Sequence, residues 1–173
     1  MEFDFFDSPI KYSSDENIDV DYRQWWSANR ENILSLEKYD SAEQSINNLK
    51  GKWESNKYDG LLGFSQGSVL VQIFAYQIQN KIINTYEPKF IVLASTFPIT
   101  DIEYKKYYES QIIYNTLIMT GSKDTLVNME YTLSLVKFFK NPKTIIHTGG
   151  HYFSTSSEIY YLFKNFLMDM MGA

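Results

Sequence analysis

Residues 63–67 read Gly-Phe-Ser-Gln-Gly, and Ser65 at their centre is the candidate nucleophile. The pentapeptide lies between an apolar run, Leu61 and Leu62, and an apolar helical pattern that starts at Val69. A serine flanked in this way is typical of a nucleophile elbow, a strained turn between a strand and a helix that exposes the serine hydroxyl. The flanking glycines are expected because side chains there would collide with the neighbouring strand and helix. Ser65 would then lie at the positive end of a helix, where a developing oxyanion is stabilised.

A serine hydroxyl needs a base, and the chain offers two histidines. A neutral imidazole must accept the serine proton before the oxygen becomes a strong nucleophile. His151 follows Gly149 and Gly150, whose conformational freedom would let its loop reach across to Ser65. His147 ends a predicted strand and is the alternative. The sequence favours His151 as the base.

The imidazole in turn needs a carboxylate that sets its tautomer. Asp124 ends a turn that follows a predicted strand, residues 116–120, and it precedes both histidines in the chain. Asp101 and Glu103 follow an earlier apolar strand, residues 90–94, and remain alternatives. The order serine, acid, histidine is that of α/β-hydrolases, in which each group follows a strand. We expect Asp124 to be the acid.

The remaining pattern alternates short apolar strands with helices, which predicts one α/β domain over residues 1–173. The expected fold is a mostly parallel sheet with helices on both faces. Ser41 with Gln44, and Thr155 with Glu158, have the spacing of capping boxes at helix starts. We predict strands at residues 3–6, 58–64, 90–95, 116–120 and 143–147, and helices from 41 onward and at 67–84, 101–109, 129–139 and 155–170. Residues 11–31 are polar and aromatic without a period, and residues 13–17 among them are expected to form an exposed loop.

Composition excludes several classes of function. The formal charge is −5 and no cluster of lysine or arginine could follow phosphates, so we expect no nucleic-acid partner. With no cysteine and two histidines, neither a thiol nucleophile nor a metal site is expected. No apolar run is long enough for a membrane span, and the first residues do not read as a signal peptide. The expected location is the cytoplasm.

Beyond the elbow, the chain resembles the fungal and animal serine hydrolases of the "family of serine hydrolases" type. The resemblance covers nearly the whole chain. It implies that Ser65, Asp124 and His151 form a catalytic triad that hydrolyses esters or thioesters with an apolar acyl part, without a cofactor. Acyl-protein and lysophospholipid thioesterases have a very similar elbow and remain an alternative. The shared markers are Arg23, Trp25 and Trp26, residues 58–67, Gly121 with Asp124, and residues 149–153.

The same resemblance suggests which groups would contact substrate. We expect the backbone N–H of Gln66 to donate to the oxyanion. Trp25 and Trp26, together with Phe64 and Phe97, are expected to line the substrate pocket. Packing of a long loop on the core is an equally good interpretation of the two tryptophans.

Two departures from the family pattern bear on activity. The family usually has Ser-Gly where this chain has Ser95 and Thr96, a change expected to narrow the pocket. The family also begins with a central strand and a His-Gly loop, so we expect an N-terminally truncated fold in which Gln66 supplies the one remaining backbone donor. Losing an oxyanion donor costs about 10²- to 10³-fold in rate, and an inactive binding module is therefore the second hypothesis. Residues 3–6 resemble the family's outer strand. In this chain they would either pair with the strand that ends at the elbow, residues 61–64, or remain apart from it.

Overall fold

The computed structural model describes residues 2–11, 22–27 and 38–172. Its main sheet has four parallel strands in the spatial order β3 (Gly60–Phe64), β4 (Phe90–Ala94), β5 (Asn115–Gly121) and β6 (Lys143–His147). The strands agree with four of the five that the sequence predicts. Their carboxyl ends lie along one edge of the sheet, where ligands bind in open α/β folds. The predicted α/β class is confirmed.

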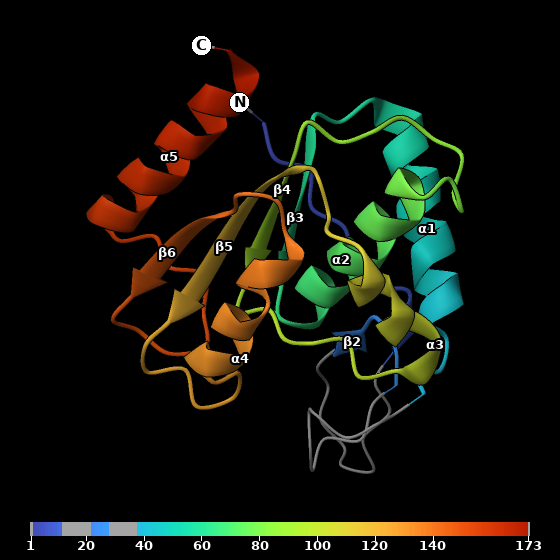
Figure 1. Ribbon diagram of the computed structural model, residues 1–173, viewed down its shortest axis with the longest axis horizontal. Helices are drawn as coiled ribbons and strands as arrows, with labels where there is room; N and C mark the ends of the chain where they lie inside the picture. Colours follow the sequence, from blue (N-terminus) through green and yellow to red (C-terminus); the bar gives the residue numbers. More distant parts are fainter. Residues whose placement is uncertain (1, 12–21, 28–37, 173) are drawn as a thin grey trace.

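Helices cover both faces of this sheet (Figure 1). The elements are α1 (Ala42–Asn56), α2 (Gln66–Gln79), α3 (Ile102–Lys105), α4 (Met129–Ser134) and α5 (Ser157–Met171). Successive strand residues alternate between the faces: Ile91 and Leu93 pack in the core with α1 and α2, whereas Val92 packs on the α5 side. Burial on both faces explains why the inner strand β4 is continuously apolar rather than alternating.

The predicted strand at residues 3–6 is wrong. This segment has no strand structure, and among the described residues β3 is an edge of the sheet. Two of its three aromatic side chains pack on separate parts of the molecule instead, whereas Phe5 is exposed. Phe3 stacks on Phe163 of α5 with ring centroids 6.2 Å apart, and Phe6 meets Trp25 edge-on at 5.4 Å. The aromatic pattern therefore reflects packing and not a ladder of backbone hydrogen bonds.

A second, small sheet follows that segment. β1 (Ile10–Lys11) pairs antiparallel with β2 (Arg23–Gln24), with Ile10 opposite Gln24. The predicted exposed loop at residues 13–17 lies outside the described residues.

Several helix boundaries differ from those that capping-box spacings and apolar periodicity predict. Ser41 precedes α1 with a φ of 70° and makes no side-chain cap, and α5 starts at Ser157 without a side-chain cap, so both predicted capping boxes are wrong. α2 ends at Gln79, short of the predicted residue 84, because the chain turns into a left-handed conformation at Lys81. The predicted helices 101–109 and 129–139 each divide into a short α-helix and a 3-10 turn, Lys106–Glu109 and Val136–Phe138.

Neither of two further features is found in the part of the chain that is described. No helix there is long and apolar enough to cross a bilayer. No group of three or more His, Asp or Glu side chains there is arranged to hold a metal ion.

Candidate active site

Ser65 occupies a strained turn between β3 and α2. Its φ of 51° and ψ of −123° lie outside the regions that a non-glycine residue normally adopts. The turn is held against the end of β4, because the Ser65 N–H donates to the Ala94 carbonyl at 2.9 Å. A β-carbon on Gly63 would lie 2.4 Å from the Gly67 carbonyl oxygen, so only glycine allows α2 to leave the strand this sharply. The strained backbone and the tight strand-to-helix turn are those expected of a nucleophile elbow, and the nucleophilic role of Ser65 stays a prediction.

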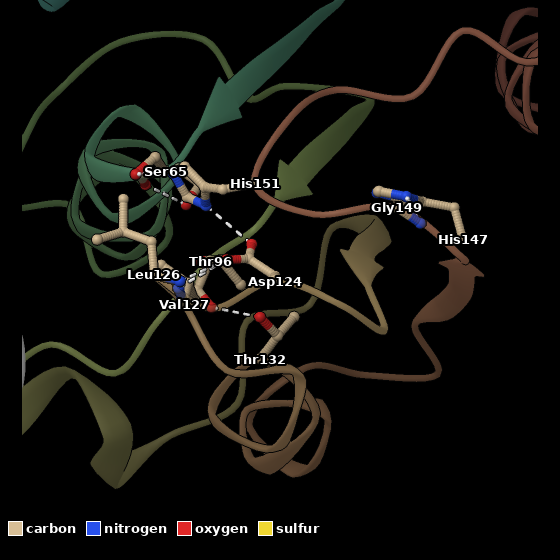
Figure 2. Close-up of polar contacts among 10 residues, drawn as sticks. Ser65, Thr96, Asp124, Leu126, Val127, Thr132, His147, Gly149 and His151 are labelled. Carbon is tan, nitrogen blue, oxygen red and sulfur yellow. Dashed lines mark hydrogen bonds and ion pairs between the residues drawn. The ribbon is translucent and has the colours of Figure 1, made fainter.

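His151 connects Ser65 to Asp124 by two hydrogen bonds (Figure 2). The His151 Nε2 lies 3.0 Å from the Ser65 Oγ, and the His151 Nδ1 lies 2.8 Å from the Asp124 Oδ2. The Asp124 side chain is fully buried and the His151 side chain is 19% exposed. This arrangement agrees with the predicted order of serine, acid and histidine along the chain. Ser65 is only half-buried, so its side chain remains accessible from solvent.

The loop after β5 holds Asp124 in place. The Asp124 Oδ1 accepts the backbone N–H groups of Leu126 at 3.0 Å and Val127 at 2.8 Å, so both carboxylate oxygens are engaged. Burial acts to raise the pKa of this carboxyl. The hydrogen bonds from Val127 and His151, with the buried Ser95 hydroxyl close by, outweigh burial and lower the pKa below its ordinary value. Asp124 is therefore ionised beside the imidazole.

His147, the alternative base, makes no contact with Ser65 among the hydrogen bonds of the described residues. Its ring is buried, its Nδ1 accepts the Gly149 N–H at 3.1 Å, and it packs against Tyr152. Burial lowers the pKa of His147 below its ordinary value, and the nearby Asp124 charge opposes this only in part. His147 thus supports the loop that carries His151.

Asp101, the alternative acid, binds backbone N–H groups and no histidine among the described hydrogen bonds. Its Oδ1 accepts the Glu103 N–H at 2.7 Å and caps α3, and its Oδ2 accepts the Tyr39 N–H. Glu103 is exposed on α3. The geometry thus joins Asp124, and neither of these two, to a histidine.

The loops that carry the acid and the histidine touch directly. A β-carbon on Gly121 would lie 2.4 Å from the Gly149 carbonyl oxygen, so the close approach requires glycine. The Ser122 N–H donates to the His147 carbonyl at 2.8 Å, and the Lys123 N–H donates to the Gly149 carbonyl at 3.0 Å. These backbone bonds fix the separation between the Asp124 and His151 loops.

The four predicted pocket residues divide into two pairs. Phe64 packs against the His151 ring, with centroids 4.8 Å apart, and Trp25 lies against the first turn of α2. Trp26 is 1% exposed and stacks on Tyr39 at 4.4 Å, and Phe97 is buried in the core. The structure therefore brings Phe64 and Trp25 to the elbow and places the other two in the interior.

Comparison with known proteins decides the family. Residues 1–160 match the family model described as "Serine hydrolase (FSH1)". The chain belongs to this serine hydrolase family.

Its relatives carry esterase names. Esterase CG5412 of Drosophila melanogaster is 32% identical over 155 residues, which cover 86% of this chain and 55% of that protein. Esterase OVCA2 of Danio rerio is 26% identical over 156 residues, covering 86% and 69%. The chain thus spans between about half and two thirds of the length of these relatives. The Pyrococcus furiosus esterase PF2001 shares the fold, with a TM-score of 0.58 and 18% identity over 78% of this chain and 65% of that one.

Sequence reasoning missed one support of the acid loop in this serine hydrolase. Thr96, expected to narrow the pocket, is buried and accepts a hydrogen bond from the Gln72 Nε2 at 2.6 Å through its Oγ1. Its carbonyl accepts the Thr132 hydroxyl at 2.6 Å, which ties α4 to the end of β4 (Figure 2). The partners are 24 and 36 residues away along the chain, so no local pattern could identify them.

Proposed function

We propose that this chain is a serine esterase that hydrolyses carboxylic esters with an apolar acyl chain. The observation that supports it is the continuous line of hydrogen bonds from the Ser65 Oγ through His151 to Asp124. A hydroxyl, an imidazole and an ionised carboxylate in this order form the minimal apparatus of nucleophilic acyl transfer. The esterase names of the relatives agree with this chemistry.

In the first half-reaction the Ser65 Oγ attacks the ester carbonyl carbon while the His151 Nε2 takes its proton. Asp124 holds the Nδ1–H of the imidazole and stabilises the resulting imidazolium. When the tetrahedral intermediate collapses, its C–O bond to the alcohol breaks and His151 returns the proton to that oxygen. Ser65 is left acylated, and the alcohol leaves.

Water completes the cycle. His151 takes a proton from a water molecule, the water oxygen attacks the acyl carbon, and the bond to the Ser65 Oγ breaks as His151 protonates that oxygen. The products are the carboxylic acid and free enzyme. Only proton transfers and water are involved, so the proposal includes no cofactor.

The oxyanion of each tetrahedral intermediate would be stabilised at the start of α2. The Gln66 N–H is the first of this 14-residue helix, and the helix dipole favours negative charge at that end. We assign Gln66 as the backbone donor of the oxyanion site.

An apolar acyl chain is the substrate that the surroundings favour. Phe64 packs on the His151 ring, and Leu126, whose N–H bonds Asp124, has a 59% exposed side chain on the acid loop. In Figure 2 the Leu126 side chain lies on the same side of that loop as Ser65. A thioester with the same acyl part would react by the same steps.

Labelling with a fluorophosphonate tests the nucleophile, because only an activated serine reacts quickly with it. We expect rapid labelling of the wild type and none of Ser65→Ala, together with loss of p-nitrophenyl ester hydrolysis. Ser55→Ala is the matched control, since Ser55 lies at the exposed end of α1, where its hydroxyl donates to the Lys52 carbonyl and accepts from the Asn56 side chain. A wild type that neither labels nor hydrolyses esters would instead favour the inactive binding module.

A further inference from the structure

The side chain of Gln66 forms a bridge that the triad chemistry does not use. Its Oε1 accepts the Trp25 N–H at 2.7 Å, and its Nε2 donates to the Trp26 carbonyl at 2.9 Å. The bridge therefore connects the residue after the nucleophile to a segment some 40 positions earlier in the chain.

That segment is held at several further points. The Trp25 carbonyl accepts the Ser45 hydroxyl of α1, and the Trp25 ring meets Phe6 edge-on. Trp26 is anchored in the core by its stack on Tyr39. With Trp26 buried, the direction of the Trp25 side chain depends on how the backbone between the two residues is held.

The Trp25 indole lies beside the reacting end of α2. Its Nε1 is 3.0 Å from the place where a β-carbon on Gly67 would be. Because Cα–Cβ bonds in a helix tilt toward its N-terminus, this position faces the turn that carries Ser65 and the Gln66 N–H. Trp25 is half-buried, so part of the indole remains available at the surface.

The bridge needs a side chain that both accepts and donates a hydrogen bond, which the amide of glutamine does at any pH. A glutamine side chain has one carbonyl acceptor and two N–H donors, and both kinds are used here. An ionised carboxylate could accept from Trp25 but would repel the Trp26 carbonyl. Alanine would form neither bond while keeping the backbone N–H.

We propose that the Gln66 side chain is a positioning residue that holds Trp25 as one wall of the acyl-binding region. This inference rests on the proposed esterase function and names a determinant of its acyl selectivity. Gln66 would then have two roles: its backbone N–H donates to the oxyanion, and its side chain positions the tryptophan that contacts the acyl chain.

The test compares octanoyl and acetyl p-nitrophenyl esters. For Gln66→Ala we expect the ratio of their kcat/KM values to fall at least about tenfold, mainly through a higher KM for the octanoyl ester, since lost contact with a few methylenes has at least this effect. Gln79→Ala is the matched control at the other end of α2. Its amide also bridges two backbone groups, accepting from the Ile113 N–H at 2.8 Å and donating to the Gln111 carbonyl at 2.9 Å, but far from the elbow.

A second variant adds a pH readout. In Gln66→Glu the introduced carboxyl group has both an acceptor and a donor only when it is protonated. The selectivity ratio should therefore be low at pH 8 and rise toward the wild-type ratio as the pH falls toward 5. Protonation of the triad affects both substrates equally and cancels in the ratio.

An unchanged ratio in Gln66→Ala, or an equal fall in Gln79→Ala, would overturn the inference. If the wild type hydrolyses neither ester, the proposed function fails, and hydrogen exchange at the Trp25 amide then tests the bridge by itself. Faster exchange there in Gln66→Ala than in the wild type supports the positioning role, and equal exchange contradicts it.

Discussion

At the scale of single residues, the site depends on how Asp124 is held. The carboxylate accepts two backbone N–H groups with one oxygen and His151 with the other. An amide in its place could keep the size of the side chain but would present an N–H to one of these donors. The carboxylate is thus needed for its acceptors as much as for its charge.

Asp124→Asn should lower kcat for ester hydrolysis about 10³- to 10⁴-fold, because the amide favours the wrong imidazole tautomer. The measurement is kcat of the folded protein at pH 8. Asp101→Asn is the comparison: Asp101 caps α3 and bonds the Tyr39 N–H, so we expect that variant to lose stability and to keep its turnover. The opposite result, an active Asp124→Asn and an inactive Asp101→Asn, would move the acid to the end of β4.

At the scale of elements, the elbow depends on backbone contact between β3 and α2. The glycine requirement there is local: the β-carbon of a larger residue at position 63 would meet backbone atoms of Gly67 and Ser68 at 2.4 to 2.6 Å. Backbone cannot move aside as a flexible side chain can.

Gly63→Ala should therefore destabilise the protein by at least about 2 kcal/mol, as overpacking of a close contact does. Gly51→Ala makes a matched control within α1, where a β-carbon meets nothing within 4 Å. That change should stabilise by about 0.5 to 1 kcal/mol, because alanine is the better helix former. Urea unfolding of the two variants measures both effects, and a stable, active Gly63→Ala would contradict the contact.

At the scale of the whole molecule, stability should depend on the charge state of His147. Burial lowers the pKa of His147 below its ordinary value of 6.5, and its Nδ1 must be unprotonated to accept the Gly149 N–H. Asp124, whose charge acts in the opposite sense, and Tyr152 are its titratable neighbours. The unfolded chain therefore binds the proton more tightly than the folded one.

It follows that the stability from His147 is complete above pH 6.5 and is lost as the pH falls below it. The thermal midpoint should fall between pH 7.5 and pH 5.5, and this fall should be smaller in His147→Asn. Asparagine keeps an acceptor near the Nδ1 position and does not titrate. Equal pH dependence in the two proteins, followed by circular dichroism, would show that His147 does not contribute.

The sequence by itself determined those features that depend on neighbours in the chain. Gly63 indicates the elbow because the backbone atoms that its β-carbon would meet belong to Gly67 and Ser68, only four and five positions further along the chain. Apolar runs predict β4 and β5 because these two inner strands are buried on both faces. A parallel sheet then brings the loops that follow its strands to one edge, and so the order of Ser65, Asp124 and His151 was enough to predict that they meet.

The tertiary structure decided what depends on contacts between distant segments. Residues 3–6 have the composition of a strand, yet the rings of Phe3 and Phe6 pack on α5 and on Trp25. The sequence left Trp25 and Trp26 equivalent, and only packing separates the buried ring from the one beside the elbow. The Gln66 bridge is of the same kind, since a glutamine's two bonds depend on which backbone groups the fold places within about 3 Å of its amide.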